Sequence, residues 1–306
     1  MKTAFLFSGQ GDQYPGMGKD LYDQYEIVQK TFEQASNVLN YDMAELCFTE
    51  NEQLDLTEYT QPAILTVSVA FMRLLEEKGI TPDAAAGLSL GEYTALVASG
   101  ALDFETAVDL VAKRGKFMAN AAPTGVGKMV AVMNAPLDTI EEACKKASEY
   151  GIVSPANYNT PKQIVIGGEK QAVDHAMDLL TEAGVRRMVP LNVSGPFHTK
   201  LLEPAARQLK ETLQEVTFDQ MQIPVISNTT AKVMKQDEIK HLLEQQVKSP
   251  VRFYESVASL KELGIERIIE VGPGKTINGF MKKIDKSIKT DRISDLKTLQ
   301  ATEETI

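Results

Sequence analysis

The sequence predicts an α/β protein with a mainly parallel sheet and a smaller unit inserted into the chain. Two observations support this. Short apolar segments alternate with helix-forming segments in the first and last parts of the 306-residue chain, as they do when helices connect parallel strands. Between residues 128 and 193 the order becomes strand, helix, strand, strand, helix, strand. We therefore expect a large subdomain at residues 1–125 and 195–306 and a small one at residues 126–194.

The composition limits the classes of partner. Hydrophobic residues make up 43% of the chain, enough for a full core, and the formal net charge is −10 with a pI near 5.0. This balance argues against nucleic acid and anionic membranes as partners. Only Cys47 and Cys144 are present, unlike a disulfide framework. No apolar run is long enough to span a bilayer and no signal-peptide pattern is visible, so we expect a soluble, cytoplasmic protein.

The first part of the large subdomain starts with a buried strand at residues 3–7, which runs into a polar turn at 8–13. A buried core helix is predicted to start at Thr60-Gln61-Pro62, where the missing N–H of proline is harmless, and to end at Gly79. A strand of small residues follows at 84–86. Further helices are predicted at residues 21–39, 92–99 and 104–121, the last with Asp103 as its N-cap.

The inserted unit has the β-α-β-β-α-β order of a ferredoxin-like fold. Its own apolar segments are sufficient for a separate small core. The predicted strands are at residues 128–133, 152–159, 163–166 and 187–193, and the predicted helices at 137–150 and 171–183.

After the insertion, the alternation of helices and strands resumes. Helices are predicted at residues 200–216, 238–246, 251–263 and 275–284, and strands at 223–227 and 265–271. From about Lys286 onward the chain is polar, and we expect a mobile tail there.

The segment Gly87-Leu88-Ser89-Leu90-Gly91 matches the G-x-S-x-G pattern of a serine on a sharp turn between a strand and a helix. Such a turn exposes the hydroxyl and directs the N–H of Leu90 towards an oxyanion formed on an attacked carbonyl. A chance match arises roughly once per ten chains of this size. An ordinary glycine-rich loop therefore remains the alternative unless a base lies elsewhere in the chain.

His198 is the best candidate for that base. It lies on the loop 194–199, which contains glycine and proline at the junction of the subdomains, whereas His175 and His241 lie in predicted helices and are expected to be exposed. A loop histidine with a local hydrogen bond is the alternative. The group that orients the imidazole is open, since no acidic residue between Ser89 and His198 stands in a telling motif, and a main-chain carbonyl can also serve.

Arg114 lies at the edge of the apolar stripe of its helix, where it can reach inward; a solvated arginine beside Lys113 and Lys116 is the alternative. Gly272-Pro273-Gly274-Lys275-Thr276 resembles the end of a phosphate-binding loop, but Ile269 stands where that motif needs glycine. A dinucleotide fingerprint fails as well, because Ile277 replaces its third glycine. Two cysteines and three histidines are scattered, with no metal-binding spacing.

Six motifs, in this order, resemble those of the malonyl-CoA:acyl carrier protein transacylases. The resemblance extends from Phe5 to about Ile284 and implies an α/β-hydrolase-like large subdomain with a ferredoxin-like insertion. The motifs are Gly9-Gln10-Gly11, Thr60-Gln61-Pro62-Ala63, Gly87-Leu88-Ser89-Leu90-Gly91-Glu92-Tyr93, Lys113-Arg114-Gly115, Phe197-His198 and Glu270-Val271-Gly272-Pro273-Gly274.

The resemblance implies a role for each of the matching residues. Ser89 is similar to the nucleophile and His198 to the base of the family, and Arg114 resembles the arginine that pairs with the malonyl carboxylate. The N–H groups of Gln10 and Leu90 correspond to the oxyanion hole. Two further roles are implied by the resemblance. The main-chain carbonyl of Gln246 resembles the group that orients the histidine. Gln61 is similar to a glutamine near the acyl pocket, and helix capping is the alternative role for it.

Two positions depart from many family members. Leu88 stands where many have histidine, and Phe197 precedes the base where some have a smaller residue. In related acyltransferase domains a bulky aromatic there accompanies malonyl rather than methylmalonyl substrates, because a ring beside the α-carbon leaves little room for a methyl branch. A misfitting methyl is worth only about 1–3 kcal/mol, so the discrimination is modest.

The resemblance thus implies transfer of malonyl from malonyl-CoA to the phosphopantetheine thiol of acyl carrier protein through a malonyl-serine, serving fatty acid biosynthesis. It implies no cofactor and no metal, and a monomer is expected. A serine hydrolase and a catalytically inactive carrier-protein-binding module are the alternative functions. Because the carrier protein is acidic in this family, we expect a local basic patch near the site. The candidates are Lys113, Lys116, Lys162, Arg186, Arg187 and Lys200.

Overall fold

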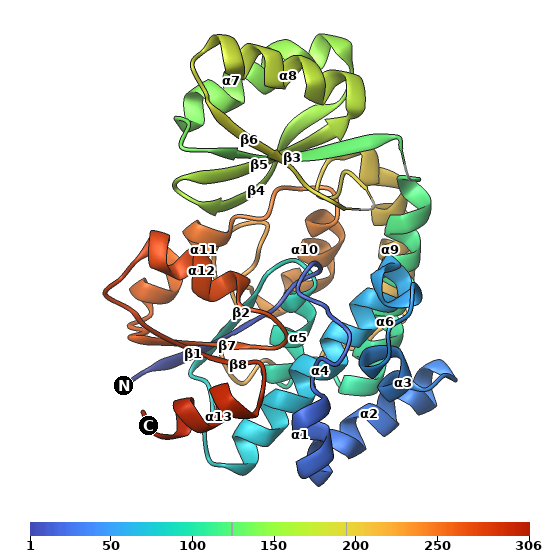
Figure 1. Cartoon of the computed structure of the whole chain (residues 1–306). Helices are drawn as coiled ribbons and strands as arrows, with labels where there is room; N and C mark the ends of the chain where they lie inside the picture. The colour runs from blue at the N-terminus through green and yellow to red at the C-terminus, as the bar shows by residue number, and fades with distance from the viewer. Residues whose placement is uncertain (124, 194) are drawn as a thin grey trace.

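The structure is a computed structural model that describes residues 1–123, 125–193 and 195–306. Thr124 lies outside the described residues, and so does Ser194, which is the first residue of the loop 194–199. Figure 1 shows a large α/β part below and a small part above it, in which helices cover one face of a sheet. The predicted α/β class is confirmed, with one parallel and one antiparallel sheet.

The parallel sheet has the strand order β2-β1-β7-β8. Its strands are β1 (Thr3–Phe7), β2 (Ala84–Gly87), β7 (Arg267–Val271) and β8 (Lys289–Ile293), and all neighbouring pairs are parallel. Phe7 is in register with Gly87 on one side and with Val271 on the other. The three strands therefore end together, and the loops that leave them meet at one edge of the sheet, where ligands bind in open α/β folds.

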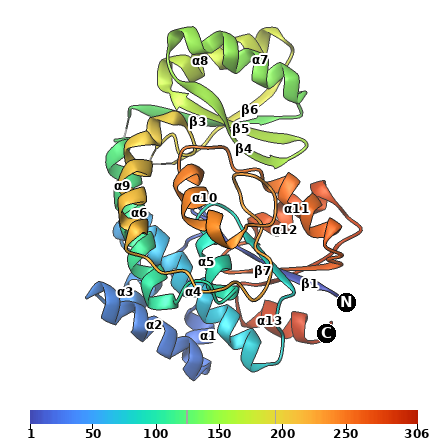
Figure 2. The same ribbon diagram turned by 180° about the vertical axis from the view of Figure 1, so that it is seen from behind.

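Both faces of this sheet are covered, which explains its continuous apolar strands. Side chains alternate between the faces: Phe5 and Phe7 belong to the core under α4 and α6, whereas Ala4 and Leu6 belong to the core under α11 and α12. Figure 2 shows α6 and α9 side by side at the back of the large part. The helices are α1 (Lys19–Gln24), α2 (Glu26–Leu39), α3 (Met43–Phe48), α4 (Thr57–Glu77), α5 (Gly91–Ala98), α6 (Phe104–Ala121), α9 (Glu203–Gln214), α10 (Ile239–Gln246), α11 (Phe253–Glu262), α12 (Thr276–Ile284) and α13 (Leu296–Glu303).

The antiparallel sheet has the order β4-β5-β3-β6. One of its faces packs on its two helices, with Val130 and Val132 in their core, while Met129 and Ala131 on the other face join the core of the large part. The elements are β3 (Gly127–Met133), α7 (Leu137–Ala147), β4 (Val153–Thr160), β5 (Gln163–Glu169), α8 (Lys170–Glu182) and β6 (Arg187–Pro190). Short 3₁₀ helices occupy Gln53–Asp55, Ser148–Tyr150, Lys200–Leu202 and Gln236–Glu238. All four predicted strands of the insertion are present, β6 being shorter than expected.

The predicted strand at residues 223–227 is wrong. This segment runs beside β2 but forms only isolated bridges, Ala85 with Val225 and Ile226 with Val233. Pro224 accepts a hydrogen bond from Ala85 N through its carbonyl but has no N–H of its own to donate. The ladder is therefore not extended, although the segment still lies along the sheet.

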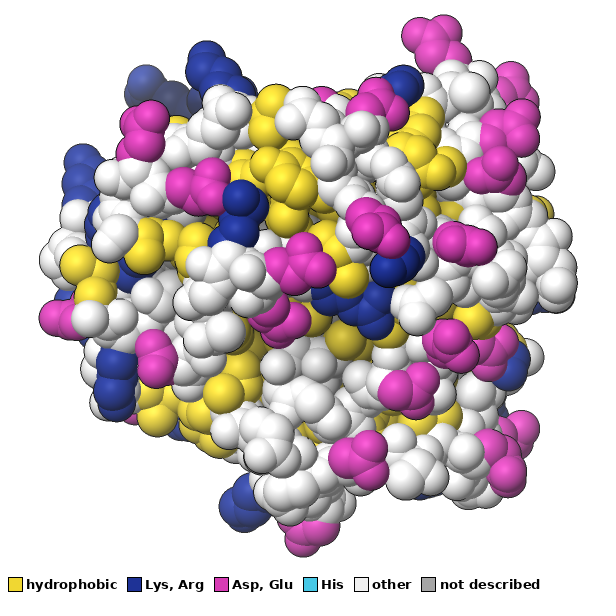
Figure 3. Space-filling model, turned by 90° about the horizontal axis from the view of Figure 1, so that it is seen from below, with side chains coloured by type: hydrophobic (Ala, Val, Ile, Leu, Met, Phe, Trp, Pro, Cys, Tyr) yellow, Lys and Arg dark blue, Asp and Glu magenta, His cyan; other side chains and the backbone are white. Residues whose placement is uncertain are grey.

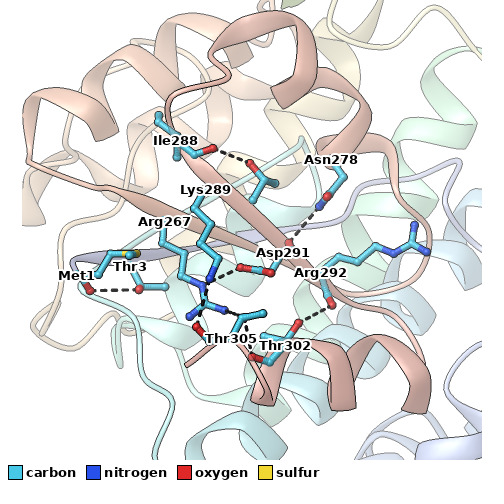
Figure 4. Close-up of polar contacts among 11 residues, drawn as sticks. Met1, Thr3, Arg267, Asn278, Ile288, Lys289, Asp291, Arg292, Thr302 and Thr305 are labelled. Atoms are coloured by element: carbon cyan, nitrogen blue, oxygen red, sulfur yellow. Dashed lines mark hydrogen bonds and ion pairs between the residues drawn. The ribbon is translucent and has the colours of Figure 1, made fainter.

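The predicted mobile tail from Lys286 is also wrong, because β8 and α13 order this segment. Figure 4 shows the guanidinium of Arg267 between Asp291 and Thr305. Its Nε donates to Asp291 Oδ2 at 2.8 Å and its terminal nitrogen to Thr305 Oγ1 at 2.8 Å, while Lys289 Nζ donates to the Thr305 carbonyl at 3.2 Å. The polar residues of the tail thus find partners within the fold, and the two chain ends lie close together (Figures 1 and 2).

Arg267→Ala is expected to lower the free energy of unfolding by about 2 kcal/mol, somewhat less than the loss of a fully buried pair, because Asp291 keeps 15% of its side chain exposed. Denaturant titration measures this. Lys146→Ala, which breaks an exposed ion pair with Glu142, is the matched control and should change little. An unchanged unfolding transition in Arg267→Ala would show that these contacts do not hold the C-terminal segment.

The surface is mixed in charge on the face seen from below. Figure 3 shows Asp and Glu side chains spread across this face, with Lys and Arg among them and no continuous basic field. Across the described ranges of the chain, every helix is too short or too polar to cross a bilayer.

Candidate active site

Ser89 lies on a strained turn between β2 and α5. Its φ is 55°, in the left-handed region that a non-glycine residue rarely adopts. A Cβ on Gly87 would overlap the backbone of Gly91, and a Cβ on Gly91 would overlap the Phe7 carbonyl. Both glycines of the motif are therefore sterically required, which weakens the alternative of an ordinary glycine-rich loop.

Two amide side chains from distant segments hold this turn. Asn228 Oδ1 accepts a hydrogen bond from Ser89 N at 2.7 Å, and its Nδ2 donates to the Gly87 carbonyl at 2.7 Å. Gln246 Nε2 donates to the Ser89 carbonyl at 2.9 Å. Asn228 is a site residue that the sequence motifs did not predict. The available signal was its place directly after the apolar segment 223–227, since polar residues that follow strands of a parallel sheet gather at one edge.

His198 contacts both the serine and Gln246. Its Nε2 lies 2.8 Å from Ser89 Oγ and its Nδ1 lies 2.7 Å from the Gln246 main-chain carbonyl. A carbonyl can only accept, so Nδ1 carries the proton and the lone pair of Nε2 faces the hydroxyl. Burial, followed by the nearby Arg114 guanidinium, lowers the pKa of His198 to about 4. The imidazole is therefore neutral at pH 7, which is the form able to accept a proton.

The other two histidines lie away from this site. His175 stacks on Tyr150 with ring centroids 3.6 Å apart and is half-buried, more covered than expected, while His241 is exposed as expected.

Arg114 points inward, against the alternative of a solvated arginine. It is 1% exposed, and it donates to Gln61 Oε1 and Gln246 Oε1, both at 2.7 Å, and to Ser89 Oγ at 3.2 Å. Among the described residues no carboxylate forms an ion pair with it. Glu92, whose charge acts on Arg114, is fully buried, and burial raises the pKa of Glu92 to about 8, which favours its neutral form at pH 7. A buried cation without a counter-ion is costly, so the site is suited to an anionic ligand.

A cavity of about 420 Å³ opens above these groups, between the parallel sheet edge and the antiparallel sheet. Seven of the eight predicted site residues line it, and Gln246 contacts three of these seven from behind. Gln10 and Leu90 line the cavity, and their N–H groups have no hydrogen-bond acceptor in the described part of the chain. The lining residues from the predicted set are Gln10, Gln61, Ser89, Leu90, Arg114, Phe197 and His198.

Within residues 1–123, 125–193 and 195–306, no group of three His, Cys, Asp or Glu side chains is placed to hold a metal ion. Gly272, in the motif that resembles a phosphate loop, has φ of 133° and packs against Ser8 and Ser68, so that a Cβ there would crowd both hydroxyls. The glycine is explained by the turn itself.

Comparison with known proteins points to one family. A family model described as "Acyl transferase domain" matches residues 4–297. The malonyl CoA-acyl carrier protein transacylase of Bacillus subtilis is 45% identical over 100% of this chain and 97% of its own length. The crystal structure of MCAT from Streptococcus pneumoniae is 60% identical, with full coverage of both chains and a TM-score of 0.98. A malonyl-transacylase solved in complex with its type II PKS acyl-carrier protein is 40% identical, with full coverage of both chains and a TM-score of 0.97.

Proposed function

This chain belongs to the acyl transferase family, and we propose that it moves the malonyl group from malonyl-CoA to the phosphopantetheine thiol of acyl carrier protein. The transfer supplies fatty acid biosynthesis. One observation carries the proposal: Ser89 Oγ lies 2.8 Å from the His198 imidazole and 3.2 Å from the Arg114 guanidinium in a single cavity. A nucleophile, a base and a holder of a carboxylate are thus within reach of one small acyl group.

The first half of the reaction forms an ester on Ser89. Arg114 binds the free malonyl carboxylate, with a planar fork of donors that lysine lacks. His198 takes the hydroxyl proton as Ser89 Oγ attacks the thioester carbonyl, and the N–H groups of Gln10 and Leu90 stabilise the oxyanion. When the carbon–sulfur bond breaks, CoA leaves as the thiol with the proton that His198 returns.

The second half reverses these steps with another thiol. The phosphopantetheine thiol of the carrier protein gives its proton to His198 and attacks the ester, and the serine hydroxyl is regenerated. Ping-pong kinetics follow from the covalent intermediate. No metal or cofactor takes part in either half, because the serine, the imidazole and the two N–H groups supply all the acid–base and electrostatic chemistry.

The acyl pocket is proposed to favour the unbranched malonyl group. Phe197 is 7% exposed and lines the cavity beside the base. Gln61 Oε1 accepts from Arg114 and its Nε2 contacts Met118 Sδ at 3.4 Å, so its side chain helps to hold the guanidinium rather than to cap α4. Discrimination against a methyl branch is worth about 1–3 kcal/mol.

We also infer the fold of each subdomain, the cell compartment and the oligomeric state. The large subdomain, residues 1–125 and 195–306, is α/β-hydrolase-like, which the elbow at Ser89 supports. The small subdomain, residues 126–194, is ferredoxin-like, which the sheet order β4-β5-β3-β6 supports. The enzyme acts as a cytoplasmic monomer. The acidic carrier protein docks at a local basic patch, for which the candidates are Lys113, Lys116, Lys162, Arg186, Arg187 and Lys200.

Malonyl-CoA consumption with and without the thiol-bearing carrier protein tests the function. We expect turnover only with the carrier protein, and a single equivalent of CoA released per enzyme without it. Continuous loss of malonyl-CoA without an acceptor would instead indicate a serine hydrolase. No reaction in either assay would indicate an inactive binding module.

The acid limb of the pH profile tests His198 as the base. The value of kcat/KM reports the free enzyme, in which burial and Arg114 lower the pKa of His198 to about 4. We therefore expect kcat/KM to fall as the pH drops towards about 4, and not near 6.5, the ordinary pKa of histidine. In the complex the malonyl carboxylate offsets the charge of Arg114, so the limb of kcat should lie at higher pH. Initial rates between pH 3.5 and 8, with circular dichroism to detect unfolding, give both limbs. A kcat/KM limb near 6.5 would contradict the assignment.

A further inference from the structure

The polar turn after β1 is anchored at both ends. Asp12 N donates to the Gly9 carbonyl at 3.4 Å, so residues 9–12 form a turn with Gln10 and Gly11 at its centre. Gly11 has φ of 107°, which glycine adopts without strain. At the first end, Gly9 packs so closely on the serine elbow that a Cβ there would overlap the Leu88 carbonyl oxygen.

The second end is anchored by a partly buried side-chain contact. Thr276 Oγ1, at the start of α12, donates to Asp12 Oδ1 at 2.5 Å. Gly274 makes room for this contact, because a Cβ on it would overlap the Asp12 carboxylate. The turn that presents the Gln10 N–H to the cavity is thus fixed to the elbow on one side and to α12 on the other.

The contact is not needed to cap α12. The first-turn N–H groups of Ile277 and Asn278 already donate to the carboxylate of Glu270, at 3.0 and 2.8 Å. A second ionised carboxyl group is unfavourable here, since burial, with Glu270 nearby, raises the pKa of Asp12 to about 7. What remains for Asp12 to stabilise is the position of its own turn.

We propose that Asp12 is a positioning residue for acyl transfer, whose hydrogen bond with Thr276 holds the turn that directs the Gln10 N–H at the oxyanion. The inference rests on the proposed function. It assigns Asp12 no contact with substrate: its effect passes through the placement of Gln10. Because the oxyanion exists only in the transition state, loosening this turn lowers the acylation rate without weakening the binding of malonyl-CoA.

Single-turnover acylation of Ser89 by malonyl-CoA tests this, with rates normalised to the active sites counted by adduct mass. Asp12→Ala and Thr276→Val are expected to lower the maximal rate about 10-fold, less than the 10²–10³-fold loss on removing an oxyanion donor. The half-saturating concentration should not change. Thr276→Ser and Asp12→Asn keep the donor and the acceptor, and should restore most of the rate. Thr302→Val, which removes a hydroxyl that donates to the Arg292 carbonyl of β8, is the matched control.

Equal rates per active site in wild type and Thr276→Val would overturn the inference, even if the variant melted at a lower temperature, since a purely structural contact changes only the fraction of folded enzyme. A loss confined to the half-saturating concentration would overturn it too. If Asp12→Ala does not fold, the Thr276→Val and Thr276→Ser pair decides. Absence of any adduct on wild-type Ser89 would contradict the proposed function, not this inference alone.

Discussion

Ser89→Ala is expected to abolish malonyl transfer to the carrier protein, with kcat falling by about 10⁴-fold or more, to the level of slow uncatalysed exchange. The hydroxyl is the atom that forms the ester, and in the described part of the chain the hydrogen-bond partner of His198 Nε2 is Ser89 Oγ, which also accepts from the Arg114 guanidinium. The oxyanion hole alone cannot form a covalent intermediate.

Steady-state transfer and intact mass of the enzyme after exposure to malonyl-CoA measure this. Ser148→Ala is the control, because Ser148 is exposed at the end of α7 and its hydroxyl donates to the Lys145 carbonyl. It should retain full activity. Transfer by Ser89→Ala at a rate near that of wild type, or a malonyl adduct on that variant, would remove Ser89 from the role of nucleophile.

Arg114→Ala is expected to lower kcat/KM for malonyl-CoA by about 100-fold, the cost of losing one partner of a buried, hydrogen-bonded charge pair. Acetyl-CoA has no carboxylate, so its use should rise relative to malonyl-CoA. The ratio of the two substrates is the informative quantity. Removing Arg114 also frees Gln61 and Gln246, and any general disturbance of the elbow through Gln246 affects both substrates alike.

Arg114→Lys separates charge from geometry. It keeps the positive charge but cannot donate in parallel to a carboxylate while holding Gln61 and Gln246. We expect a preference between those of wild type and Arg114→Ala. An unchanged ratio of malonyl-CoA to acetyl-CoA use in Arg114→Ala would contradict the carboxylate role.

The sequence could predict those parts of the site whose requirements are local. The glycines at 87 and 91 are visible because the elbow they permit lies within five residues. Pattern alone placed Arg114 at the edge of a stripe but could not decide its burial, since that depends on Gln61 from α4 and Gln246 from α10 meeting it from other segments. Only the resemblance to a family had pointed to Gln246.

Other features depend on contacts between segments that are far apart in the chain. Asn228 meets Ser89 across 139 residues of chain, and an asparagine after an apolar segment is common in loops. Strand β8 was missed because Lys289 and Asp291 are polar; their partners, Thr305 and Arg267, are supplied by the fold and not by neighbouring sequence. The prediction for the segment 223–227 was wrong in the opposite sense. Its apolar residues predict a strand, but Pro224 prevents the strand from extending.

The most direct measurement is a chase experiment followed by mass spectrometry of the whole enzyme. Wild-type protein is mixed with malonyl-CoA, freed of excess substrate, and divided between buffer and the thiol-bearing carrier protein. We expect one malonyl group per chain, mapped to the peptide that contains Ser89, stable in buffer and lost to the carrier thiol within seconds. An adduct on another residue, or one that the carrier protein does not discharge, would contradict it.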